Sequence, residues 1–270
     1  MRRVRLRLFP LVAVSFCLLC GCSTTANISE RAQHESLPLG WERTWRAAKS
    51  AALAPETWAP VVGALALQIG DADKNLQSWA AQQTPVFGSQ RNADQMSDDL
   101  TLASSSLWIT SALAPVGDDD GGKWLVNKVH VLGVQAGAGM LLSSAVGYLK
   151  DETKRMRPNQ LGTTSFPSYH ASKSGLYTTM TMRNVSKLGW SDRAVSNTQL
   201  GLYSLTAATA WARVEANQHY PSDVLAGIAL GHFFGAFFTD AFLGSNNPNR
   251  AQLMFAPSRE LSMMIVQFDF

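Results

Sequence analysis

Three short segments of this chain gather residue types that bind phosphate in proteins. The first is rich in cations and ends at Arg157, the second ends at His170, and the third runs from Arg213 to Asp223. Each lies at the edge of an apolar stretch that we expect to be helical. A helix N-terminus presents unpaired N–H groups and a positive dipole end, which favour an anion. A guanidinium adds a planar fork suited to phosphate oxygens. The three segments therefore predict an anion site.

Two histidines accompany this predicted anion site. His219 is followed four residues later by Asp223, at the expected start of the next helix. A carboxylate on one imidazole nitrogen fixes the tautomer and leaves the other nitrogen free as a nucleophile. The second histidine, His170, can serve as a proton donor. Nucleophile, orienting group, acid and anion-binding cations are the parts needed for phosphoryl transfer through a phosphohistidine.

The three segments resemble the signature of the phosphatidic acid phosphatase type 2 (PAP2) superfamily. That superfamily includes bacterial class A acid phosphatases, lipid phosphatases and vanadium haloperoxidases. Its pattern reads K-x6-R-P, then P-S-G-H, then S-R-x5-H-x3-D. The chain departs from it twice, because Tyr169 replaces the glycine and Ala212 replaces the first serine. The matching positions, with all spacings kept, are Lys150, Arg157, Pro158, Pro167, Ser168, His170, Arg213, His219 and Asp223.

The resemblance implies a role for each matching residue. His219 would attack phosphorus, Asp223 would hydrogen-bond His219, and His170 would protonate the leaving oxygen and then activate water. The phosphate oxygens would be held by Lys150, Arg157, Arg213, Ser168 and the backbone N–H of Tyr169. The ring of Tyr169 would narrow the site or contact the substrate. No metal or other cofactor is expected, because the cations supply the charge stabilisation, and vanadate is expected to bind as a phosphate analogue.

The sequence predicts that the elements positioning these residues are helices. Six apolar stretches, rich in Ala, Leu, Gly and Ser, are too long for strands and are separated by turn residues; they span about 58–69, 100–114, 124–149, 171–188, 198–214 and 222–243. They predict an all-α fold, a PAP2-type helical bundle of about six core helices. Gly227, Gly231 and Gly235 form a small face that permits close helix packing. A compact bundle is favoured over a membrane-spanning one, since 129–149 holds four glycines and several polar residues.

The last residues have a different pattern. Val266, Phe268 and Phe270 alternate with polar residues, a period of two that indicates a β-hairpin packed on the bundle. We therefore expect four segments: a lipoprotein signal peptide at 1–21, a lipid-anchored tether at 22–40, a PAP2-type phosphatase domain at 41–243, and a tail with a hairpin at 244–270.

The N-terminus predicts the location. Four arginines precede an apolar run from Leu8 to Leu19, as in a secretory signal. Leu19-Cys20-Gly21-Cys22 resembles a bacterial lipobox, with Cys22 as the acylated residue, and an ordinary signal cut elsewhere is the alternative. Ser23 is typical of lipoproteins sent to the outer membrane. We expect a periplasm-facing outer-membrane lipoprotein of a Gram-negative bacterium, with the inner membrane as the alternative.

Composition excludes some partners. Once residues 1–21 are removed, 19 basic residues face 20 acidic ones, so no nucleic-acid partner is expected. The three cysteines all lie at or before Cys22, which leaves no disulfide and no thiolate metal site in the mature chain. The aspartates of 118–120 lack the ligand pattern of a calcium loop and predict a turn. Lys154 and Arg155 are interpreted as a solvated face, and His130 and His232 as packed, hydrogen-bonded histidines.

Several functions stay open at this point. The favoured hypothesis is metal-independent hydrolysis of a phosphate monoester or diphosphate, with a phosphorylated lipid as the substrate because the anchor holds the site near a membrane. A small soluble phosphate ester is the enzymatic alternative. The others are a vanadium-dependent haloperoxidase, a lipid phosphotransferase, and a structural lipoprotein that merely keeps the pocket.

Overall fold

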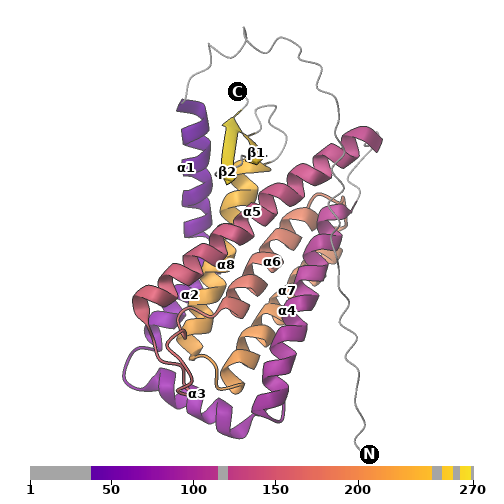
Figure 1. The fold of residues 1–270 in the computed structure, drawn as a ribbon. Helices are drawn as coiled ribbons and strands as arrows, with labels where there is room; N and C mark the ends of the chain where they lie inside the picture. The colour runs from indigo at the N-terminus through magenta and orange to yellow at the C-terminus, as the bar shows by residue number, and fades with distance from the viewer. Residues whose placement is uncertain (1–37, 115–120, 245–250, 258–261, 269–270) are drawn as a thin grey trace, which may run out of the picture. The chain divides into compact units, whose positions relative to one another are not determined.

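The computed structural model describes residues 38–114, 121–244, 251–257 and 262–268 of the 270. The predicted signal peptide, Cys22 and the aspartate-rich turn at 118–120 lie outside these residues. The described part contains eight helices (Figure 1): α1 (Pro38–Leu53), α2 (Pro55–Ala66), α3 (Ala72–Gln83), α4 (Gln90–Leu113), α5 (Gly121–Thr153), α6 (Tyr169–Val185), α7 (Asp192–Glu215) and α8 (Pro221–Phe242).

The expected all-α fold is confirmed for residues 38–114 and 121–244. The six predicted stretches correspond to α2 and α4 through α8. Residues at the N-termini of two of these helices favour helix initiation. The hydroxyl of Ser89, which precedes α4, accepts a hydrogen bond from the backbone N–H of Asn92 at 3.1 Å, and Pro221 occupies the first turn of α8. Helices α1 and α3 were not predicted, and α1 begins at Pro38, where the tether was expected to continue to residue 40.

The centre of the bundle is the pair α6 and α8, with α4 and α7 beside α6 (Figure 1). The predicted small face of α8 lies against α6. A methyl group added at Gly231 would come within 2.1 Å of the carbonyl oxygen of Ser172, and one at Gly227 within 2.6 Å of that of Ser168. The two backbones therefore approach more closely than any larger residue would allow.

Apolar side chains of α5, α6 and α8 form the main core. Leu142, Leu176 and Met180 are almost fully buried there. Phe238 and Phe242 form the part of this core at the C-terminal end of α8. A smaller cluster joins α3, α6, α7 and α8 at the opposite end of α8; it consists of Ala80, Ala171, Ala210, Val214 and Val224. The helix ends that carry the predicted site lie beside this smaller cluster.

Two antiparallel strands follow the helices. β1 (Ala251–Pro257) pairs with β2 (Ser262–Phe268), with Met254 opposite Ile265. The side chains of residues 251–270 lie outside the described part of the chain. The packing of a hairpin on the bundle therefore stays a prediction.

Two described helices are long and apolar enough to cross a membrane, Trp124–Thr153 and Pro221–Phe242. Core helices of soluble proteins meet the same criterion, and 56% of the apolar window in the second is buried inside the bundle. The first is only 33% buried and exposes Val126, Val129 and Met140. This pattern favours association with a membrane without specifying which one.

Candidate active site

The predicted site residues come from four helix ends that the fold brings together. Lys150 lies in the last turn of α5, Ser168 directly precedes α6, Arg213 lies in the last turn of α7, and His219 directly precedes Tyr220, the residue before α8. The backbone N–H of Ser168 donates to the carbonyl oxygen of Asp223 at 3.0 Å, which joins the start of α6 to the start of α8. The helix ends thus meet at one end of the bundle.

His219 is buried, with 2% of its surface exposed. Its Nδ1 lies 2.6 Å from the carbonyl oxygen of Ser165. Because a carbonyl oxygen can only accept, Nδ1 carries the proton and Nε2 holds the lone pair. Nε2 makes no hydrogen bond within the described residues. Burial, followed by the charges of Arg213, Lys150 and Arg157, holds the pKa of His219 well below its usual value, so the ring is neutral and its Nε2 is available as a nucleophile.

Asp223 does not make the expected hydrogen bond with His219, since its Oδ2 lies 3.9 Å from Nδ1. Oδ2 instead accepts from the hydroxyl of Ser165 at 2.6 Å and from the backbone N–H of Tyr220 at 2.9 Å. The carboxylate is held at the start of its own helix and is linked to His219 through Ser165. Burial raises the pKa of Asp223, and the hydrogen bond from Ser165 and the charge of Arg155 oppose that shift.

The three predicted cations lie close enough to His219 to influence its pKa, and each has a protein partner. Lys150 donates to the carbonyl oxygen of Thr164, and burial, with the charge of Arg157, lowers the pKa of Lys150 to about 8. Arg157 donates to the hydroxyl of Thr164 at 3.2 Å and to the side chain of Gln218. The three charges therefore surround His219, Lys150 from the last turn of α5, Arg157 from the α5–α6 connection and Arg213 from the last turn of α7.

Arg213 is 5% exposed and bonded to α4. Its Nη1 lies 2.6 Å from a carboxylate oxygen of Asp94 and 2.9 Å from the hydroxyl of Ser97. Burial lowers the pKa of Arg213, and Asp94 opposes that shift. Its Nε is buried and has no partner in the described structure. The sequence did not identify Asp94, because no local pattern connects it with a residue 119 positions away.

The start of α6 offers further unpaired donors. The hydroxyl of Ser168 is fully buried and has no partner among the described residues, although Ser168 stands at the N-cap position. The first N–H groups of any helix, here those of Tyr169 and His170, have no acceptor within the helix. A buried polar group without a partner is costly unless a ligand satisfies it. The Ser168 hydroxyl, the helix N-terminus and Nε of Arg213 therefore fit an anion.

His170 is held by a carboxylate that the sequence did not reveal. Its Nε2 lies 2.8 Å from an oxygen of Asp98 in α4. Burial and the charge of Arg213 lower the pKa of His170, while the hydrogen bond to Asp98 raises it. Asp98 therefore orients the ring and favours its protonated form, as a proton donor requires.

The side chain of Tyr169 packs between helices. Its hydroxyl lies 2.6 Å from that of Ser143 in α5, and the ammonium of Lys173 stands 4.8 Å from its ring centre. The ring also borders a cavity of about 260 Å³ between α4, α5 and α6, which Trp108 and Tyr177 help to line. The ring of Tyr169, which replaces the motif glycine, thus packs against α5, while the backbone N–H of Tyr169 stays at the start of α6.

Arg155 is not the solvated residue that the sequence predicted. Its guanidinium bridges two buried carboxylates, at 2.6 Å from Asp223 and 2.7 Å from Asp73 in α3, and its side chain is only 28% exposed. It also stacks on Tyr220, 4.4 Å from the ring centre. Sequence reasoning missed Asp73, because α3 was not predicted. His232, in contrast, is buried and bonded to Thr57 at 2.7 Å, as expected for a packed histidine.

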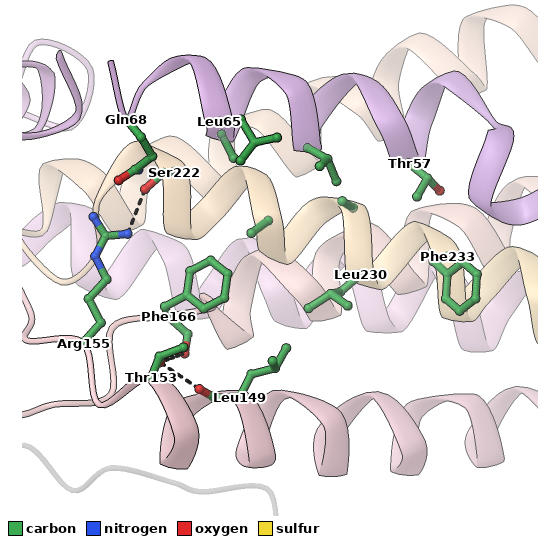
Figure 2. A pocket seen from close by; sticks show the side chains of 14 residues that line it. Thr57, Leu65, Gln68, Leu149, Thr153, Arg155, Phe166, Ser222, Leu230 and Phe233 are labelled. Atoms are coloured by element: carbon green, nitrogen blue, oxygen red, sulfur yellow. Dashed lines mark hydrogen bonds between the residues drawn. The ribbon is translucent and has the colours of Figure 1, made fainter. Parts of the chain in front are cut away.

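An apolar groove of about 720 Å³ begins beside Arg155 (Figure 2). Its walls come from α2, α5 and α8, and include Leu65, Leu149 and Leu230. Its polar end is formed by Arg155 and Ser222, which are hydrogen bonded at 2.8 Å. The groove thus borders the outer side of the network that surrounds Asp223.

No group of three or more His, Cys, Asp or Glu side chains that could hold a metal ion occurs within the described ranges. The ligand suggested by the geometry is instead an anion of phosphate type. A helical bundle with a neutral buried histidine, three cations and unpaired donors at a helix N-terminus defines a class of phosphate-handling proteins.

The comparisons with known proteins agree with this class. Residues 132–246 match the family model of the PAP2 superfamily. The matched segment contains α6, α7, α8 and most of α5, with every predicted residue of the anion site. No curated protein and no solved structure matches the chain.

Proposed function

We propose that the protein is a metal-independent phosphatase that hydrolyses a phosphate monoester or diphosphate through a phosphohistidine. The match of residues 132–246 to the PAP2 superfamily supports a phosphatase-type activity on phosphate esters. The observation that carries the mechanism is the state of His219: it is buried and neutral, its Nδ1 proton is held by Ser165, and three cations surround it.

The reaction follows from these groups. The lone pair on Nε2 of His219 forms a bond to phosphorus as the ester P–O bond breaks, and His170 gives its proton to the leaving oxygen. Lys150, Arg157 and Arg213 balance the charge of the phosphoryl oxygens, and Ser168 donates its unpaired hydroxyl to one of them. Water then attacks the phosphohistidine, His170 takes up the proton of that water, and inorganic phosphate leaves with His219 restored.

A phosphorylated lipid is the substrate class we favour. Exposed apolar side chains on α5 support contact with a membrane, where such a substrate is found. The proposal includes lipid attachment at Cys22, a periplasm-facing location at the outer membrane with the inner membrane as the alternative, and binding of vanadate as a phosphate analogue.

Phosphate release by the purified full chain tests this function. The substrates are p-nitrophenyl phosphate, phosphatidic acid and a polyprenyl diphosphate, each assayed with chelator present. His219→Ala should abolish release and His232→Asn, which keeps a hydrogen-bonding side chain beside Thr57, should not. A quench in alkali, where phosphohistidine survives, should recover labelled phosphate on the wild-type protein. Release that persists in His219→Ala would contradict the mechanism, and the ratio of kcat/KM values would separate lipid from soluble substrates.

A further inference from the structure

Arg155 holds together the residues behind the nucleophile. Its Nη1 donates to Asp223 at 2.6 Å and to the hydroxyl of Ser222 at 2.8 Å, and its Nη2 donates to Asp73 at 2.7 Å. Asp73 is 4% exposed and Asp223 is fully buried. One guanidinium therefore bridges two carboxylates and offsets the repulsion between them in a region with little water.

The backbone of Arg155 is part of the same arrangement. Its carbonyl oxygen accepts a hydrogen bond from the N–H of Ser165 at 3.0 Å, while the hydroxyl of Ser165 donates to Asp223 at 2.6 Å. Ser165 is thus fixed at its N–H and at its hydroxyl. Its remaining polar group, the carbonyl oxygen, is the one that accepts from Nδ1 of His219 at 2.6 Å.

We infer that Arg155 is a positioning residue for His219. By holding Asp223 and Ser165 in place, it keeps the Ser165 carbonyl on Nδ1 and so directs the lone pair of Nε2 toward phosphorus. The inference rests on the proposed function of His219 as the nucleophile. Arg155 has no place in the family signature, since it lies among the six unspecified positions between Lys150 and Arg157.

The fork of the guanidinium is needed for this role. Two nitrogens of one rigid plane reach two carboxylates on different helices, α3 and α8, which a single ammonium cannot do with the same geometry. Figure 2 shows the side chain reaching from the α5–α6 connection to Ser222 at the end of the groove. The partly exposed outer edge of Arg155 makes this position accessible to small solutes.

The test compares Arg155→Ala and Arg155→Lys with Lys154→Gln, the neighbouring exposed basic residue, in the full chain. Because a misplacement of about 1 Å in a catalytic group can cost about 10²-fold in rate, kcat of Arg155→Ala should fall by about that factor. KM should change little, because Arg155 is directed away from the substrate phosphate by its two carboxylates. Lys154→Gln should behave as wild type, and Arg155→Lys should recover only part of kcat.

Two further readouts separate positioning from a general loss of structure. Methylguanidinium in solution should restore part of kcat to Arg155→Ala and nothing to His219→Ala. The Nδ1 proton of His219 should give a nuclear magnetic resonance signal downfield of the amide region in the wild-type protein, and this signal should be lost in Arg155→Ala. If Arg155→Ala does not fold, Asp73→Asn replaces it, with a smaller fall in kcat and a weakened Nδ1 signal expected.

An unchanged kcat in Arg155→Ala overturns the inference. A raised KM at constant kcat also overturns it, because that result would mean that Arg155 contacts the substrate directly. If the wild-type protein releases no phosphate from any ester, the proposed function fails. The Nδ1 signal still decides in that case whether Arg155 orients His219.

Discussion

The two site histidines differ in how far their environment lowers their pKa, and in the proposed mechanism this difference sets the pH range of activity. The pKa of His219 lies well below 6.5, and that of His170 lies below 6.5 by a smaller shift that Asp98 limits. His219 must be neutral and His170 protonated at the same time. The rising limb of a pH profile therefore reports deprotonation of His219, the falling limb reports deprotonation of His170, and the optimum of kcat/KM lies on the acid side of 6.5.

Deprotonation of Lys150 should add a second change of slope to the pH profile, on its alkaline side. In the proposed mechanism the side chain of Lys150 binds phosphate only while protonated, and its pKa in the free protein is about 8. On a logarithmic plot, the slope of kcat/KM should steepen from about −1 to about −2 above that pH. Lys150→Arg should remove the second change of slope, since a guanidinium stays charged throughout. The measurement is kcat/KM for p-nitrophenyl phosphate on both sides of pH 8. If the change of slope persists in Lys150→Arg, a group other than Lys150 causes it.

Sequence spacing could predict which residues gather at the candidate anion site, because each stands close to a helix boundary. The spacing could not predict what holds them. Asp73, Asp94 and Asp98 lie on α3 and α4, far away in sequence, and their carboxylates look like ordinary surface charges until the helices pack. For the same reason Arg155 was interpreted as solvated, and the carbonyl oxygen of Ser165 could not be foreseen as the acceptor for His219. The catalytic roles themselves remain predictions.

At the scale of elements, close contact between α6 and α8 supports the site, because Ser168 and Asp223 lie at the starts of these two helices. A methyl group at Gly231 would meet backbone atoms of Ser172 and Leu176, which cannot rotate away. Gly231→Ala should therefore lower the free energy of unfolding by about 1–3 kcal/mol and reduce kcat as the helix starts separate.

Gly201 provides the matched control for this prediction. It is exposed on α7, and a methyl group added there meets nothing within 4 Å. Gly201→Ala should raise the free energy of unfolding by about 0.4–1 kcal/mol, because alanine restricts the unfolded chain. Urea unfolding followed by circular dichroism measures both variants. Equal stability of the two proteins would show that the helices can separate at little cost.

The helices that the sequence predicts are those with long, continuous apolar stretches. Helices α1 and α3 carry many polar residues, and the apolar residues that they bury are small: Ala47 and Ala51 on α1, Ala80 and Ala81 on α3. Small residues give a weak periodic signal, so packing rather than local pattern decides that these segments are helical.

At the scale of the whole molecule, apolar side chains remain exposed on several helices. Val126 and Val129 on α5 are 69% and 63% exposed, and Leu65 in the last turn of α2 and Ile69 just after that helix are exposed to a similar degree. Exposed apolar surface of this extent marks a contact with lipid or protein. Its presence on the described bundle means that membrane association need not depend on the predicted lipid anchor alone.

Flotation with phospholipid vesicles tests this surface. A full chain with Cys22→Ser should still float, and Val126→Lys with Val129→Lys in that background should lower partitioning by at least about tenfold, since each buried valine contributes about 1.5–3 kcal/mol. Ser196→Lys with Asn197→Lys adds the same charge on an exposed polar part of α7 and should leave flotation unchanged. Equal flotation of all three proteins would show that α5 does not touch the lipid.

The hydrogen bonds of Arg155 and Asp73 also bear on how the molecule assembles. Asp73 lies 82 residues before Arg155 and 149 before Ser222, and Arg155 lies 68 before Asp223. Each of these contacts closes a long loop, whose entropy must be lost before the contact stabilises anything. Because the chain is synthesised from its N-terminus, Asp73 and Arg155 are both present before Asp223, which arrives with α8. The candidate site cations of α5 and α7 thus also precede the helix that completes the site, and activity should appear only in the last stage of folding.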